Sequence, residues 1–208
     1  MRNRAENQIT LLMIRHGAVI SNKEHRYLGK TDESLMEAGV MELVGYSNAK
    51  RYPEVEHLFA SPMKRCRETA AILYPGRQPI IIPEWEEMDF GAFEGKNYLE
   101  LRKDSRYQAW IDSNGMLPFP EGESREEFEF RCEKGFHRML HRICRMADEK
   151  GREPETIGMI VHGGTIMALL SRYYGGEYFD YQVSNGGGYV CRLEGWRAKP
   201  VVTGLRGL

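Results

Sequence analysis

The sequence lacks the features of several protein classes. Its four cysteines lie far apart and form no C-x-x-C pair, which argues against a zinc ribbon or a disulfide framework. No apolar run approaches the length of a transmembrane helix, and the polar segment from Met1 to Gln8 has no signal-peptide core. The formal net charge of −1 gives no basic excess for nucleic acid or anionic membranes. We therefore expect a cytoplasmic protein with no nucleic-acid or membrane partner.

The length and composition favour one globular unit. The 208 residues, of which 41% are hydrophobic and 28% charged, can bury one sizeable core but are few for two. No internal repeat, low-complexity tract or linker interrupts the chain. We expect a single domain over residues 1–208.

Short apolar runs alternate with helical patterns along the chain. The runs predict strands at residues 11–14, 57–60, 80–82, 156–161 and 189–193. Helical spacing predicts helices at residues 35–44, 62–73, 99–111, 125–147 and 166–173, separated by a long polar loop at 21–34 and an acidic loop at 84–95. This alternation predicts a three-layer α/β/α sandwich with a mainly parallel central sheet.

Two predicted helices have marked starts. Ser61 followed by Pro62 is typical of an N-cap and a first helical position. Ser124 to Glu127 is an S-x-x-E capping box, and the helix after it is apolar on one face and charged on the other. We expect this long helix to pack across one face of the sheet.

Cationic and imidazole side chains directly follow three predicted strands. Arg15 and His16 follow the first, Arg65 lies shortly after the second, and His162 follows the fourth. Because parallel strands end at the same edge of a sheet, we expect these side chains to converge. Guanidinium groups bind phosphate oxygens bidentately, helix N-termini add backbone donors, and a neutral imidazole can attack phosphorus. The pattern predicts a phosphoryl site that needs no metal.

Motifs along nearly the whole chain carry a family resemblance. They are R-H-G at 15–17 with Asn22 six residues after the histidine, S-P-x-x-R-x-x-x-T-A at 61–70, E-x-x-x-G-x-x-E-G at 87–95, G-E-S at 122–124 and H-G at 162–163. In this order they resemble the histidine phosphatase superfamily, also called the phosphoglycerate-mutase-like family. The resemblance implies a phosphoglycerate-mutase-like fold.

The resemblance also implies a role for each site residue. His16 would be the nucleophile that becomes phosphohistidine, and Arg15, Arg65 and His162 would hold the phosphoryl group. Glu87 would protonate the leaving alcohol and later help to deprotonate water. Asn22, Gly29 and Gly163 would form the substrate-binding set, with no cofactor and no metal. The substrate would be a small-molecule phosphomonoester.

Two positions depart from the family pattern. Ala18 stands directly after the R-H-G triplet, where many members carry a polar residue, and Leu28 replaces a polar residue in the loop. An apolar Leu28 cannot hydrogen-bond a small acid, so we expect a larger or less polar alcohol moiety. The sequence from Glu87 to Gly91 also resembles the α-ribazole phosphatase branch, although broad-specificity members share it.

Several alternatives stay open. The first is a cofactor-dependent phosphoglycerate mutase, against which the region 103–119 argues because it lacks paired arginines. The second is a non-catalytic phosphate-binding scaffold. Asp89 is the next candidate for the acid, and His137 and His141, four residues apart on one helix, are weak candidates for a metal site. The interpretation we favour is a histidine acid phosphatase-type phosphomonoesterase.

Overall fold

A six-stranded sheet forms the centre of the computed structural model, which describes residues 8–208. The strand order is β3-β2-β4-β1-β5-β6. The strands are β1 (Gln8–Arg15), β2 (His57–Ala60), β3 (Ile80–Ile81), β4 (Thr156–Val161), β5 (Gly188–Glu194) and β6 (Val201–Gly207). Strands β1 to β4 run parallel, and β5 and β6 add an antiparallel edge next to β1.

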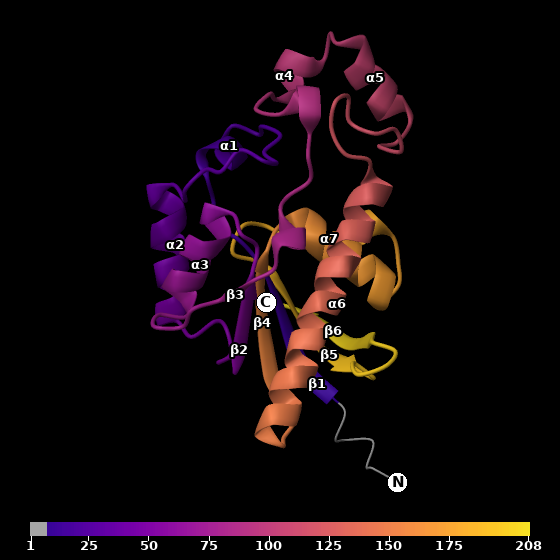
Figure 1. Ribbon diagram of the computed structural model, residues 1–208. Coiled ribbons are helices and arrows are strands. Elements are labelled where there is room, and N and C mark those ends of the chain that lie inside the picture. The colour runs from indigo at the N-terminus through magenta and orange to yellow at the C-terminus, as the bar shows by residue number, and fades with distance from the viewer. Residues whose placement is uncertain (1–7) are drawn as a thin grey trace.

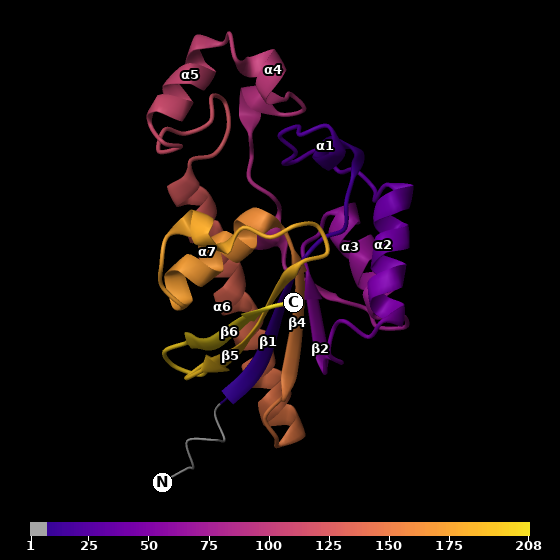
Figure 2. The same cartoon turned by 180° about the vertical axis from the view of Figure 1, so that it is seen from behind.

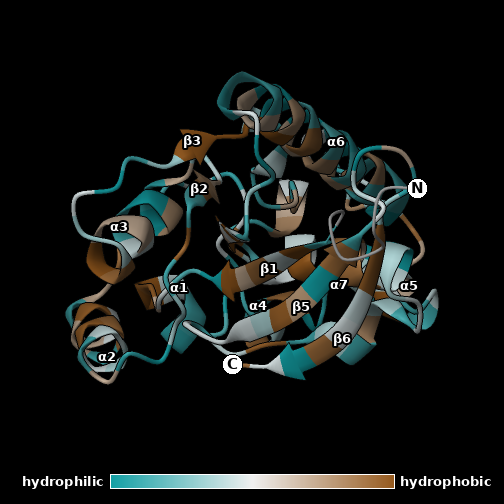
Figure 3. Ribbon diagram, turned by 90° about the horizontal axis from the view of Figure 1, so that it is seen from below, coloured by the Kyte–Doolittle hydropathy of each residue, from teal (hydrophilic) through white to brown (hydrophobic). Residues whose placement is uncertain are grey.

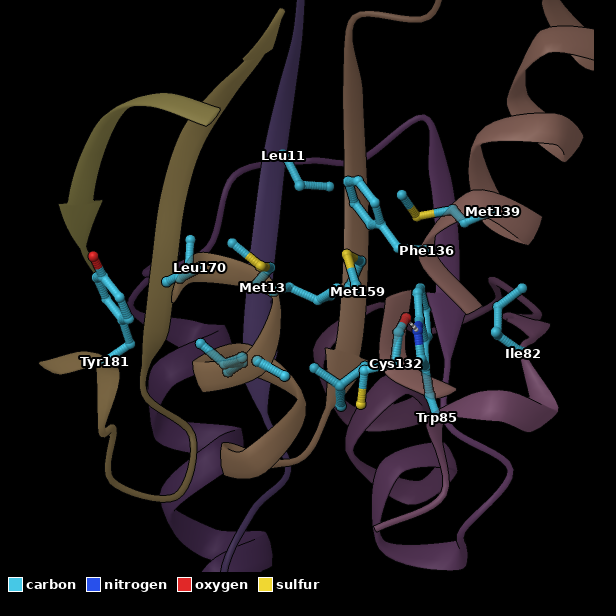
Figure 4. Packing of buried hydrophobic residues seen from close by; sticks show 14 of the residues in the cluster. Leu11, Met13, Ile82, Trp85, Cys132, Phe136, Met139, Met159, Leu170 and Tyr181 are labelled. Carbon is cyan, nitrogen blue, oxygen red and sulfur yellow. Dashed lines mark hydrogen bonds between the residues drawn. The ribbon is translucent and has the colours of Figure 1, made fainter. Parts of the chain in front are cut away.

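Helices cover both faces of this sheet (Figures 1 and 2). On one face lie α2 (Glu37–Asn48) and α3 (Lys64–Leu73), and on the other α6 (Arg125–Lys150) and α7 (Gly163–Tyr173). Alternation along β1 supplies both cores: Leu12 and Ile14 pack with the first pair of helices, whereas Leu11 and Met13 pack with the second (Figure 4). The predicted three-layer sandwich is confirmed.

The long helix α6 follows its sequence pattern closely. The Ser124 hydroxyl accepts the N–H of Glu127, which completes the predicted capping box, and the helix ends at Gly151 with a φ of 64°. Its buried face joins the larger core, while hydrophilic residues cover much of the rest (Figure 3). No helix in residues 8–208 is both long and apolar enough to cross a membrane.

A small cap, which we define as residues 96–119, lies beyond the carboxyl ends of the strands (Figure 1). It contains α4 (Tyr98–Leu101) and α5 (Ser105–Asp112), and α1 (Ile20–Lys23) lies at the same end of the strands. A cluster of aromatic side chains, with centroids of neighbouring rings 4.9 to 5.3 Å apart, joins the cap to nearby loops. Its members are Tyr27, Phe90, Phe93, Tyr107, Trp110 and Phe119. The cap therefore stands over the sheet edge at which the site residues were expected.

Two local predictions are wrong, and one strand was not predicted. Helix α3 begins at Lys64 and not at Pro62, because Met63 is its extended N-cap residue and the Asp32 carboxylate accepts the N–H of Lys64 at 2.7 Å. The Ser61 hydroxyl accepts the N–H of Met63 and also bonds His162. The single helix expected at 99–111 is broken before Asp104, which caps α5. The sequence pattern also gave no sign of β6, the outer antiparallel strand.

Candidate active site

The parallel pairing of β1 with β4 brings two histidines together. Arg15 and Val161 are partners at the ends of these strands, so His16 and His162 follow side by side. Their ring centroids are 5.2 Å apart at an interplanar angle of 68°, and the side chains are only 2% and 0% exposed. Two residues far apart in the sequence thus form one buried imidazole pair.

The ring of His16 is fixed in one tautomer. Its Nδ1 lies 2.7 Å from the carbonyl oxygen of Gly17, which can only accept, so Nδ1 carries the proton. Burial, reinforced by the charges of Arg65 and Arg15, lowers the pKa of His16 well below its ordinary range. A neutral ring with its proton on Nδ1 leaves the lone pair of Nε2 free to act as a nucleophile.

His162 uses the opposite ring nitrogen. Its Nε2 lies 2.8 Å from the hydroxyl oxygen of Ser61, and its Nδ1 lies 3.7 Å from Oε2 of Glu87. The Sγ atom of Cys66 contacts the same ring. Burial and the charge of Arg65 lower the pKa of His162 well below its ordinary range. This imidazole is therefore also neutral and is oriented by Ser61.

Two arginines beside the histidines are held by backbone oxygens. Fully buried Arg65 donates from Nη1 to Thr31 at 2.9 Å and from Nη2 to Gly29 at 3.0 Å, and Arg15 donates from Nη1 to Val183 at 2.7 Å. In residues 8–208 neither forms a salt bridge, and the Nε atoms of both are buried without a hydrogen-bond partner. Two guanidinium groups without a salt bridge, each with a hydrogen-bond donor left unpaired, favour the binding of an anion.

Glu87 is the carboxyl group nearest the imidazole pair. Its Oε1 accepts the N–H of Met88 at 3.0 Å, and a Cβ on Gly164 would lie 3.0 Å from that oxygen, so glycine leaves room for it. Burial raises the pKa of Glu87, although the Met88 N–H and the charges of Arg65 and Arg15 act against the rise. A carboxyl group with a raised pKa beside the site is suited to donate a proton.

Asp89, the rival candidate for the acid, has other partners. Its Oδ2 pairs with Lys30 at 2.5 Å and its Oδ1 accepts the N–H of Gly91. Although partial burial acts in the opposite direction, these hydrogen bonds lower the pKa of Asp89. It is an ionised loop anchor, which leaves Glu87 as the better candidate.

The expected substrate-binding residues lie around this site in different settings. Oδ1 of Asn22 accepts the side-chain amide of Asn185 at 2.9 Å. Gly29 donates its N–H to the Glu94 carboxylate and gives its carbonyl to Arg65. Gly163 begins α7, where an added Cβ would lie 3.6 Å from Nε of Arg15. Gly29 therefore holds Arg65 through its backbone, while contact of any of the three with substrate stays a prediction.

Asn185 and Ser61 are site residues that the sequence did not reveal. The amide of Asn185 donates to the carbonyl oxygens of His16 at 3.0 Å and Gly17 at 3.3 Å, as well as to Asn22. The only sequence signal was the glycine run just after Asn185, and Ser61 resembled a helix cap. Ser61 therefore orients the ring of His162, and Asn185 holds the backbone of His16.

The spacing of His137 and His141 does not mark a metal site. In the described part of the chain no group of three or more His, Cys, Asp and Glu side chains could hold a metal ion. His137 instead places Nε2 3.2 Å from the hydroxyl of Tyr173.

Comparisons with known proteins find similar proteins with phosphatase and mutase names. A Hydrogenobacter thermophilus protein named as a phosphoserine phosphatase is 26% identical over 193 residues, 89% of this chain and 90% of that protein. The alpha-ribazole phosphatase structure from Shigella flexneri has a TM-score of 0.73 at 23% identity and covers 93% of this chain and 95% of its own. A phosphoglycerate mutase structure from Thermus thermophilus has a TM-score of 0.66 at 27% identity, covering 96% of this chain and 99% of its own.

A family model decides the membership. The model of the histidine phosphatase superfamily, branch 1, matches residues 11–204. This range includes both histidines, both arginines and Glu87. The chain belongs to the histidine phosphatase superfamily.

Proposed function

We propose that this protein is a phosphomonoester hydrolase that works through a phosphohistidine at His16. The observation that carries the proposal is the pairing of a neutral His16, whose Nε2 is left free, with the buried and partnerless Nε atoms of Arg15 and Arg65. A nucleophile beside a set of unpaired cationic donors is what phosphoryl transfer requires, since its catalysis is mostly positioning and charge stabilisation.

In the first step the lone pair on Nε2 of His16 attacks phosphorus. The bond between phosphorus and the ester oxygen breaks, and that oxygen takes the proton of the Glu87 carboxyl group. Arg15 and Arg65 donate hydrogen bonds to the non-bridging oxygens, and His162 contacts them from the other side. The products of the step are a free alcohol, an ionised Glu87 and a phosphohistidine.

In the second step water replaces the alcohol. The Glu87 carboxylate takes a proton from the water as its oxygen attacks phosphorus. The bond between phosphorus and Nε2 breaks, and the electron pair returns to the imidazole. Inorganic phosphate leaves, and His16 and Glu87 are back in their starting protonation states.

The cap supports a hydrolase over a phosphoglycerate mutase. Arg106 is the arginine of α5, and its guanidinium is bound to Asp104 at 2.9 Å and to Glu121 at 3.8 Å. Its charge is thus paired with carboxylates of this chain and not left to hold a substrate carboxylate. Among the relatives, however, both phosphatase and mutase names occur. The mutase is the second candidate for that reason.

The proposal for the substrate rests on one group of relatives and on the apolar side chain of Leu28. An adenosylcobalamin/alpha-ribazole phosphatase of Salmonella typhimurium is 26% identical over 167 residues. Leu28 is only 7% exposed in the loop whose next residue, Gly29, contacts Arg65. An apolar residue there fits an alcohol larger than glycerate, such as α-ribazole, or a broad range of phosphomonoesters.

The test is a panel of phosphomonoesters assayed for phosphate release. It includes α-ribazole phosphate, phosphoserine and both phosphoglycerates, with His16→Ala as the matched inactive variant. We expect phosphate release that depends on His16 and exceeds any interconversion of 2- and 3-phosphoglycerate. Faster interconversion would establish the mutase, and unchanged release by His16→Ala would leave a phosphate-binding scaffold.

A further inference from the structure

Helix α6 carries an arginine that contacts the segment bearing Glu87 from outside the active site. Nη1 of Arg131 donates to the carbonyl oxygens of Glu84 at 2.7 Å and Glu86 at 2.9 Å. Its Nη2 lies 3.3 Å from the carbonyl oxygen of Glu87 itself. One guanidinium group therefore donates hydrogen bonds to three backbone carbonyl oxygens of residues 84–87.

The same guanidinium is oriented by a carboxylate. Nε and Nη2 of Arg131 bond the two oxygens of Glu123 at 2.9 and 2.8 Å. Glu123 also exchanges two bonds with Asp89: its N–H donates to the Asp89 carbonyl at 2.9 Å, and its Oε2 accepts the Asp89 N–H at 3.3 Å. Glu123 is the central residue of the G-E-S motif, so this pair spans both sides of Glu87.

The backbone around Glu87 has few other supports. Residues 83–85 form a short 3-10 helix and residues 86–90 no regular structure, so no sheet partner fixes them. The indole of Trp85 donates to the carbonyl of Cys132 at 3.3 Å, again on α6 (Figure 4). Gly135 makes room for this ring, since a Cβ there would lie 2.5 Å from it. Helix α6 is thus the platform on which the acid segment lies.

We propose that Arg131, oriented by Glu123, is the positioning residue for the Glu87 carboxyl group. It does not touch the reacting atoms. Its planar fork fits a carboxylate and three carbonyls at once, which the single ammonium of lysine cannot do. This inference rests on the proposed function, because it assigns Arg131 to the proton-transfer part of that reaction alone.

The test compares substrates that need the acid with substrates that do not. An alkyl phosphate has a poor leaving group and depends on proton donation, whereas p-nitrophenyl phosphate does not. We expect Arg131→Lys to lower kcat for the alkyl ester by roughly ten- to a hundredfold, with an aryl loss below about threefold. Glu123→Gln, which keeps the side-chain shape, should give a weaker loss of the same pattern.

Arg138→Lys is the matched control. Arg138 lies seven residues further along α6 and also holds Glu84, but through its carboxylate, at 2.8 Å, and not through a backbone carbonyl. We expect kcat to change less than about twofold on either substrate, since lysine keeps the charge that faces the Glu84 carboxylate and no hydrogen bond to a backbone carbonyl is lost. Thermal unfolding of all variants identifies any that fold poorly.

The double variant Arg131→Lys with Glu87→Gln separates positioning from structural support. If Arg131 acts through Glu87, adding Arg131→Lys to Glu87→Gln causes no further loss of kcat on the alkyl ester. Additive losses, or equal losses on alkyl and aryl esters in Arg131→Lys, would overturn the positioning role. Failure of the proposed function gives a different result: the wild-type protein would release no phosphate from any ester.

Discussion

His16 and His162 lie edge to face, yet they are bound through opposite ring nitrogens. Nδ1 of His16 meets the Gly17 carbonyl, and Nε2 of His162 meets the Ser61 hydroxyl. Each ring therefore turns a different nitrogen toward the site: Nε2 from His16 and Nδ1 from His162. The two imidazoles are not interchangeable, and only His16 combines a defined proton on Nδ1 with a free Nε2.

The pH dependence of kcat/KM follows from these settings. Because burial and two arginines lower the pKa of His16, its ring stays neutral as the pH falls past the ordinary value of 6.5. The acid limb should thus have its midpoint below 6.5. Because burial raises the pKa of Glu87, activity on alkyl esters should fall as the pH rises through that raised value.

The profile is measured with two esters whose phosphate groups differ in pKa, which separates ionisation of the enzyme from that of the substrate. In Glu87→Gln the fall on the alkaline side should disappear. An acid limb at or above 6.5 with both esters would contradict a buried, neutral His16.

Removing the hydroxyl of Ser61 should slow the reaction without weakening binding. Ser61→Ala deletes the 2.8 Å hydrogen bond to His162. A bond of about 1 to 1.5 kcal/mol corresponds to roughly a five- to tenfold loss of kcat. Ring ¹⁵N NMR shifts should change for His162 and stay constant for His16. The control is Ser171→Ala, which removes a hydroxyl that donates to the Ala168 carbonyl at 3.1 Å in the last turns of α7; an equal loss there would mean that only stability is involved.

Asn185 should be intolerant of a change from amide to carboxylate. Asn185→Asp turns a donor toward three oxygens, those of His16, Gly17 and Asn22, into a charged acceptor. We expect a loss of kcat above about tenfold and a lower Tm, since each buried acceptor loses its donor. Asn114→Asp makes the same chemical change at an exposed position of the cap and should have little effect. Retained activity in Asn185→Asp would contradict this anchoring of His16.

Metal removal should leave the activity unchanged. In the proposed reaction Arg15 and Arg65 provide the positive charge that a metal ion supplies in metal-dependent phosphatases. We expect initial rates after extended dialysis against EDTA to equal those of the untreated protein. A large loss that added divalent cations restore would require a metal in the reaction.

Much of the fold could be predicted because local patterns and packing agree. The strands at 57–60 and 156–161 have the predicted bounds, and the capping box at Ser124 starts α6 as expected. Strand β6 could not be predicted, because only Val202 of it is buried and Gly204 interrupts it with a φ of 59°. The residue pattern of a strand also does not tell whether its neighbour runs parallel or antiparallel, so the antiparallel pairing of β5 with β1 could not be predicted.

Some residues of the candidate site could be predicted from the sequence, and others could not. Arg15, His16 and His162 were predictable because they lie at or directly after the ends of β1 and β4, and parallel strands end at one edge. Arg65 was predictable for the same reason, since it lies in the first turn of α3, which follows β2. Arg131 was not, because it recognises backbone carbonyls, which every residue carries, at positions far from it in the sequence. Ser61 was misinterpreted because its hydroxyl bonds His162, distant in sequence, and accepts the N–H of Met63, which is itself the N-cap of α3.

The most direct measurement is to trap and locate the phosphoryl group. The enzyme is mixed with a phosphomonoester, quenched in alkali within milliseconds, digested and mapped by mass spectrometry, with His16→Ala in parallel. Our account predicts an acid-labile, alkali-stable phosphate on His16 that forms and decays at rates consistent with turnover, and none in the variant. Phosphate on His162 or on another side chain, or turnover with no phosphoenzyme, would contradict it.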